Sequence, residues 1–129
     1  MPKVTKGGKW VFGRAIVVPD KDVLIPTKAF QEYGFYQGDP VVFTRGSKRS
    51  AGFGLGHRDK VAASMIRSRI IGEGLIGKEM HVHLPQTVNK NPGEHLLVIR
   101  GSNLALGFLL KGPIVDEARL HPGHEVYQS

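Results

Sequence analysis

An internal duplication limits the fold of this chain more than any other sequence feature. Residues 38–47 align without a gap onto residues 93–102, at an offset of 55. Seven of the eighteen positions from Gly38 to Leu55 are identical in the two stretches. The duplication predicts two copies of one β-rich unit, called here repeat one (about residues 9–55) and repeat two (about residues 64–110).

Both repeats are expected to share one domain, residues 1–129, because a chain of this length supports one well-buried core rather than two. The 17 glycines and 8 prolines predict many tight turns and a mainly β fold. Cysteine is absent, which excludes disulfides and thiolate metal ligands. At the same offset, two upstream residues of repeat one, Arg14 and Ile16, align with Arg69 and Ile71.

Each repeat is predicted to run strand, strand, connector, strand, strand. In repeat one the strands are 14–18, 23–25, 40–45 and 51–55. The connector is a short helix with Thr27 as N-cap, Phe30 and Tyr33 on its inner face and Gly34 just beyond its end. In repeat two the strands are 69–71, 79–84, 95–100 and 104–110, and residues 86–92 predict a loop or a single turn.

The segments outside the repeats are expected to be less regular. Asp59 is positioned to cap a linking helix, about residues 59–67, with Val61 and Met65 on one face. In the tail, residues 111–129, a helix is predicted near 115–120 and a loose end after it.

One stretch of repeat one resembles a known family. Residues 23–39 contain a strand ending in Ile25-Pro26, a short helix, and then Gly38-Asp39 leading a strand, and this order is similar to that of the AbrB/MazE/SpoVT-like swapped-hairpin family. Repeat two carries the shorter matches Leu84-Pro85 and Gly93-Glu94. The resemblance implies a small pseudo-twofold barrel with one or two short helices, both halves in one chain. The swapped-hairpin and double-psi strand orders both remain open.

The same resemblance implies DNA binding of the transcription-regulator type, through basic residues near the first hairpin. The charge is consistent with this: the formal net charge is +7, and residues 1–67 hold twelve Lys and Arg against five Asp and Glu, whereas residues 68–129 hold six of each. Such a field attracts polyanions, so DNA is the expected partner, with RNA as a weaker option. The candidate contact residues are Lys9, Arg14, Lys21, Lys28, Lys48 and Arg49.

The alternative is a non-enzymatic barrel that binds a small anionic ligand or a protein partner, using its clefts and the glycine-rich segment 52–56. No catalytic triad, nucleophile motif or carboxylate pair is evident, so no enzyme activity and no cofactor are predicted. His81 and His83 alternate on a strand, as metal ligands can, but the sequence favours a pair of surface histidines.

Two further motifs recur in both repeats and are interpreted as structural. Arg45-Gly46-Ser47 and Arg100-Gly101-Ser102 predict tight turns in which the glycine has a positive φ and the serine closes the turn. Asp39 and Glu94, each after a glycine, are expected to accept turn hydrogen bonds.

A cytoplasmic protein without a membrane partner is expected. The basic N-terminus lacks the apolar run of a secretory signal, and no segment reaches the roughly 18 apolar residues of a membrane span. A homodimer remains open, since the fused repeats imply a self-sufficient unit.

Overall fold

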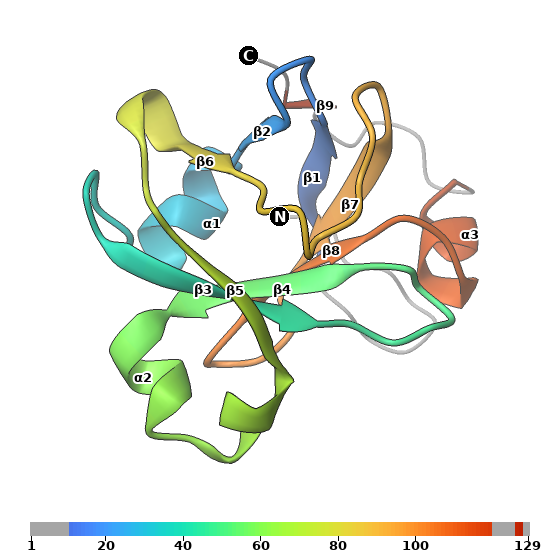
Figure 1. Cartoon of the computed structure of the whole chain (residues 1–129). Coiled ribbons are helices and arrows are strands. Elements are labelled where there is room, and N and C mark those ends of the chain that lie inside the picture. Colours follow the sequence, from blue (N-terminus) through green and yellow to red (C-terminus); the bar gives the residue numbers. More distant parts are fainter. Residues whose placement is uncertain (1–10, 120–125, 128–129) are drawn as a thin grey trace.

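The structure is a computed structural model that describes residues 11–119 and 126–127. The described chain is mainly β, with short helices at the periphery (Figure 1). Its strands are β1 (Val11–Ile16), β2 (Asp22–Leu24), β3 (Pro40–Arg45), β4 (Phe53–His57), β5 (Ile70–Leu75), β6 (His81–His83), β7 (His95–Ile99), β8 (Leu106–Leu109) and β9 (Val126–Tyr127). Its helices are α1 (Thr27–Glu32), α2 (Arg58–Ala62) and α3 (Pro113–Arg119), with 3₁₀ helices η2 (Met65–Arg69) and η3 (Lys78–Met80).

The strand order shows that the two repeats exchange their first strands. One sheet has the order β5-β3-β4-β8-β7-β1-β9, and β2 pairs with β6 in a second, two-stranded sheet. The first strand of repeat one, β1, therefore pairs with the third strand of repeat two, β7, and β5 pairs with β3 in the same way. If each strand from β5 to β1 is replaced by its counterpart in the other repeat, the same order results, read in the opposite direction. The strand order therefore has pseudo-twofold symmetry.

The offset of 55 holds only for the second half of each repeat. Val23 pairs directly with Val82 across the β2–β6 ladder, an offset of 59. Likewise Arg14 lies opposite Leu97 and Glu73 lies opposite Val42, so Glu73 is the counterpart of Arg14. The predicted match of Arg14 with Arg69 was wrong.

Backbone geometry supports the offset of 59. Lys21 and Met80 both adopt positive φ, 62° and 64°. The β1–β7 and β3–β5 ladders also have register irregularities at corresponding places, beside Gly13 and Gly72. The four-residue difference lies in the connector: repeat one holds α1, whereas the shorter connector of repeat two forms no helix, as predicted.

Helix positions were predicted less well than strands. α1 begins at Thr27, but its N-cap is Pro26 and no side chain caps it, so Thr27 is not the cap. The predicted linking helix is two short helices: the N-cap residue of α2 is His57 rather than Asp59 and makes no side-chain cap hydrogen bond, and the helix breaks before η2, whose N-cap Ser64 accepts from the Ile66 N–H. That break leaves Met65 exposed rather than beside Val61.

Strand and tail boundaries shifted by a few residues because ladder pairing, not local composition, ends a strand. β4 begins at Phe53 rather than 51, and β5 continues to Leu75. The tail helix was predicted correctly in outline and forms α3. The loose end expected after it was wrong for Val126–Tyr127, which pair in parallel with β1 as β9.

One buried hydrophobic cluster joins residues of both sheets, and Phe53 and Phe108 belong to it. Phe53 and Phe108 are directly paired across β4 and β8, and their rings stack with centroids 4.7 Å apart. Leu55, Leu106 and Phe43 surround them and are fully buried. Among the described helices, none is long and apolar enough to cross a membrane.

Candidate anion-binding pocket

The predicted DNA-contact residues lie in separate regions of the molecule. Lys9 lies outside the described residues. Arg14 is half-buried on β1, and Lys21 is exposed in the β1–β2 turn. Lys28 is exposed in the first turn of α1, whereas Lys48 and Arg49 are exposed in the β3–β4 turn. These turns and α1 are well separated (Figure 1), so the described five residues do not form one continuous surface.

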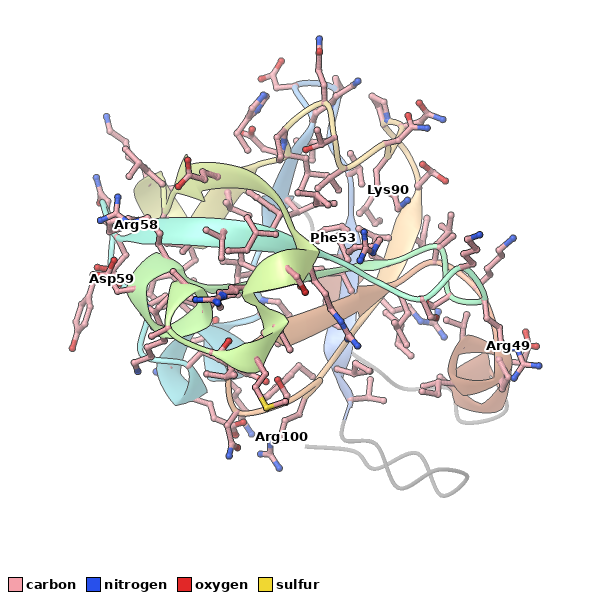
Figure 2. The ribbon with its side chains drawn as sticks, turned by 60° about the horizontal axis from the view of Figure 1, so that its bottom comes forward. Arg49, Phe53, Arg58, Asp59, Lys90 and Arg100 are labelled. Atoms are coloured by element: carbon pink, nitrogen blue, oxygen red, sulfur yellow. The ribbon has the colours of Figure 1, made fainter. Side chains whose placement is uncertain are left out.

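Other cations do converge. A pocket of about 560 Å³ lies on the face of β4 and β8 that carries Gly54 and Gly107 and points away from the Phe53–Phe108 stack. It extends from the β3–β4 turn to the β7–β8 turn, with η2 and α3 as walls. Figure 2 brings this side forward and shows Arg49 beside α3, with Arg100 well away from it. We call this cavity the basic pocket.

Of the described residues, four cations line the basic pocket: Arg45, Arg49, Arg69 and Lys111. They meet at one end, because the Lys111 N–H bonds the Ser50 carbonyl in the β3–β4 turn, and the pairing of Thr44 with Ile70 brings Arg69 beside Arg45. Among the residues that the structure describes, no carboxylate lines the pocket. Within the described part of the chain, none of the four forms an ion pair. This end of the pocket therefore carries a net positive charge.

Thr44 adds a buried polar group to the charged end. Thr44 lines the pocket and is only 5% exposed, and its counterpart in repeat two is the apolar Ile99. Its hydroxyl makes no hydrogen bond with any residue that the structure describes. A buried hydroxyl without a partner costs about 1–3 kcal/mol of stability, so such groups usually have one. A bound ligand would supply it.

The opposite end of the pocket has the same Arg-Gly-Ser sequence, but of these three residues only Gly101 and Ser102 line it, and no cation among the described residues does. Nε and Nη2 of Arg100 donate to the two carboxylate oxygens of Glu32, at 2.6 and 2.5 Å. These hydrogen bonds raise the pKa of Arg100. The Tyr33 hydroxyl donates to the Ser102 carbonyl at 2.7 Å.

Glu32 is the last residue of α1 and Tyr33 is its C-cap, and repeat two has no equivalent helix. Among the described residues Arg45 has no acidic partner, and the connector of repeat two forms no helix at the place from which α1 presents Glu32 to Arg100. The two Arg-Gly-Ser motifs have different surroundings for this reason.

The hydrogen bond from the Tyr33 hydroxyl to the Ser102 carbonyl predicts a change in stability at alkaline pH. Burial, and next the charge of Glu32, raise the pKa of Tyr33 from its ordinary 10.0 to about 12. The folded state holds the Tyr33 hydroxyl proton more tightly than the unfolded state does. The contribution of this proton to the free energy of unfolding is therefore complete below pH 10 and is lost as the pH rises through about 12. We expect the free energy of unfolding to fall across this window, and Tyr33→Phe to remove that part of the fall. Denaturant titrations of both proteins at several pH values test this; an identical pH dependence would contradict it.

The glycine and serine of the two turn motifs are structural, as predicted, but for a partly different reason. Ser47 Oγ accepts from the Ser50 N–H, and Ser102 Oγ accepts from the Leu104 and Ala105 N–H groups. The glycines do not have positive φ. A Cβ at Gly46 would lie 2.5 Å from the Gly52 carbonyl oxygen, and one at Gly101 would lie 2.7 Å from that of Ala105. Close backbone approach, not φ, requires glycine here.

Asp39 and Glu94 are turn acceptors, as predicted. Asp39 Oδ2 accepts from the Tyr36 N–H at 2.9 Å, and Glu94 Oε1 accepts from the Asn91 N–H. Most of the glycine-rich segment 52–56 forms β4.

The paired histidines are engaged with nearby protein groups. His83 Nδ1 lies 2.7 Å from Asp22 Oδ1, and His81 Nδ1 lies 3.0 Å from the Lys78 carbonyl oxygen. Across the described ranges, no group of three or more His, Asp or Glu side chains has an arrangement that could hold a metal ion.

Sequence reasoning did not assign a site role to Thr44, Arg69 or Lys111, and it treated Arg45 as a turn residue. One signal was present in the repeat. Thr44 is a polar residue inside a buried strand at the position where repeat two has Ile99. A polar residue that replaces an apolar one at a buried position indicates a local function.

No family model and no curated protein matches this chain. Among solved structures it is similar to the solution structure of PHS018 from Pyrococcus horikoshii, at 16% identity and a TM-score of 0.39, over 79% of this chain and 91% of that one.

Proposed function

We propose that this protein binds a small organic anion in the basic pocket. The observation that carries the proposal is the meeting of four cations at one end of a cavity; among the described residues, none of the four forms an ion pair and no carboxylate lines the cavity. Three of the four are arginines, whose planar donor groups match carboxylate and phosphate oxygens. The volume of about 560 Å³ lies within the usual range for small-molecule sites.

A pair of matched fluorescent probes tests this proposal. The anionic 8-anilinonaphthalene-1-sulfonate should bind at low salt at least about tenfold more tightly than its neutral analogue N-phenyl-1-naphthylamine, which corresponds to about 1.4 kcal/mol. Added salt should reduce the difference, because the cations are exposed. Equal affinity for the two probes would mean that the pocket selects apolar surface only, and the proposal would be wrong.

The charge distribution favours a second candidate, DNA binding. The excess of twelve Lys and Arg over five Asp and Glu in residues 1–67 includes Lys48 and Arg49, which lie in the turn at the charged end of the pocket. If about four phosphates are contacted, affinity for duplex DNA should fall roughly a hundredfold between about 50 and about 200 mM salt. The double variant Lys48→Glu/Arg49→Glu should weaken binding further. A flat salt response, or unchanged binding by the variant, would remove this candidate.

We also propose that the eight strands β1 to β8 close into a small barrel. β1 leads through a tight turn into β2, β2 pairs with β6, and β6 follows β5 through a turn of the same type, so the two-stranded sheet bridges the two ends of the larger one. The exchange of first strands between repeats, with antiparallel pairing throughout these eight strands, supports the swapped-hairpin order and the resemblance to the AbrB/MazE/SpoVT-like family.

A further inference from the structure

The basic pocket differs from end to end, and this difference limits what can fill it. At one end Arg45 and its three cationic neighbours have no acidic partner among the described residues. At the other end Gly101 and Ser102 line the pocket, whereas Arg100 is not a lining residue and is bound by Glu32; the Ser102 carbonyl accepts a hydrogen bond from Tyr33. A ligand with a charged group at each end would place one of its two charged groups against the neutral Ser102 turn. A ligand with a single charged group is therefore favoured.

The walls between the two ends are apolar. Ile66 comes from η2, Ile99 and Leu109 from the sheet, and Ile114 from α3. Ile66, Leu109 and Ile114 are half-buried, so a chain lying against them would remove apolar surface from water. Burial of each methylene is worth about a three- to fourfold gain in affinity. The part of the ligand beyond its charged group should therefore be apolar.

The Thr44 hydroxyl indicates where the charged group of the ligand would bind. Thr44 lines the pocket near the end of β3, just before the turn that carries Arg49, and pairs with Ile70, the residue after Arg69, so it lies at the charged end. It is a buried donor without a partner in the described structure. An oxygen of an anionic head group held by the arginines would accept a hydrogen bond from it.

We propose that the basic pocket holds a straight-chain amphiphile with one oxyanion head group, the head at Arg45 and Thr44 and the chain directed toward the Ser102 turn. This inference rests on the proposed function and specifies its ligand class. A carboxylate and a phosphate monoester share the required chemistry.

The first experiment varies chain and head group separately, using isothermal titration of the full chain. Butanoate, octanoate and dodecanoate form the chain series, octyl phosphate is the second head group, and octyltrimethylammonium is the cationic control. Octanoate should bind about a hundredfold more tightly than butanoate, given the gain per methylene. Octyltrimethylammonium should bind at least about tenfold more weakly than octanoate.

The outcomes separate this inference from the proposed function. Affinity for carboxylates that does not depend on chain length would overturn the amphiphile and leave anion binding intact. Octyltrimethylammonium binding as tightly as octanoate would overturn both. Octyl phosphate binding much more tightly than octanoate would support the class and identify phosphate monoesters as its members.

The second experiment uses Thr44→Val, which removes the hydroxyl and keeps the shape. Affinity for octanoate should fall about tenfold, whereas folding stability without ligand should be unchanged or higher, because the hydroxyl has no partner to lose in the described structure. Thr87→Val, at an exposed position outside the pocket, is the matched control and should change neither. Unchanged octanoate affinity in Thr44→Val, or a loss of stability without ligand, would overturn the placement of the head group.

Discussion

Reversing two charges in the basic pocket, with Arg45→Glu and Arg69→Glu together, is expected to weaken binding of 8-anilinonaphthalene-1-sulfonate about a hundredfold. Two unit charges about 4 Å apart in water interact with about 1 kcal/mol, and each substitution replaces an attraction by a repulsion. The two substitutions together would cost about 4 kcal/mol of binding free energy on this basis. Salt and solvent exposure reduce that cost to about 2.7 kcal/mol, which is a factor of about a hundred in affinity. Both arginines are exposed, so the fold should tolerate the change.

A matched variant separates the pocket from the general charge of the protein. Lys21→Glu/Lys28→Glu changes the net charge by the same amount, but its two exposed cations lie in the β1–β2 turn and on α1, outside the pocket lining. Its effect on probe affinity should be below about threefold. An equal loss in both double variants would show that the probe responds to the overall field, and the pocket would lose its assigned role.

Truncating the aromatic pair on the pseudo-twofold axis is expected to give the largest loss of stability. Phe108 is fully buried and stacks on Phe53, so Phe108→Ala removes a large core side chain and leaves a cavity. Such substitutions cost about 3–5 kcal/mol. That is a large share of the roughly 5–15 kcal/mol that stabilises a typical domain. Urea titration followed by circular dichroism measures the difference.

Two related variants test the origin of that loss. Phe108→Leu retains most of the volume and should cost less than Phe108→Ala. Phe53→Ala should cost about as much, because Phe53 occupies the corresponding position in repeat one. If the ring pair contributes beyond its burial, the double alanine variant should be less destabilised than the sum of the two by about 0.5–1.5 kcal/mol. A cost below about 1 kcal/mol for either alanine variant would contradict a shared core centred on this pair.

Much of the local structure could be predicted because it depends on residues close together in the chain. The turn acceptors Asp39 and Glu94 bond to a backbone N–H three residues earlier, and Ser47 closes a turn within three residues. The four strands of each repeat were also recovered, since alternating apolar residues must face a core wherever they pair. Strand ends and the cap of α1 were less accurate, because pairing across the sheet sets those limits.

The pocket could not be predicted in the same way. Arg45 and Arg100 occupy the same motif at an offset of 55, and their local sequences give no reason to treat them differently. The fixed offset also concealed the four-residue shortening, and it aligned Arg14 with Arg69 rather than with Glu73. A gap in the alignment at the connector would have corrected this.

The amino-acid sequence by itself determined that the chain is a duplicated, mainly β unit with a positive N-terminal half. These properties follow from composition, periodicity and short-range hydrogen bonds. Only the tertiary structure decided that the first strand of each repeat pairs with the third strand of the other. It also decided that Arg100 is the arginine with an acidic partner, and that the Thr44 hydroxyl is buried without a partner in the described structure. Those outcomes depend on contacts such as Tyr33 to Ser102, 69 residues apart, and Glu32 to Arg100, 68 residues apart. Contacts of that range form only when the whole sheet is assembled.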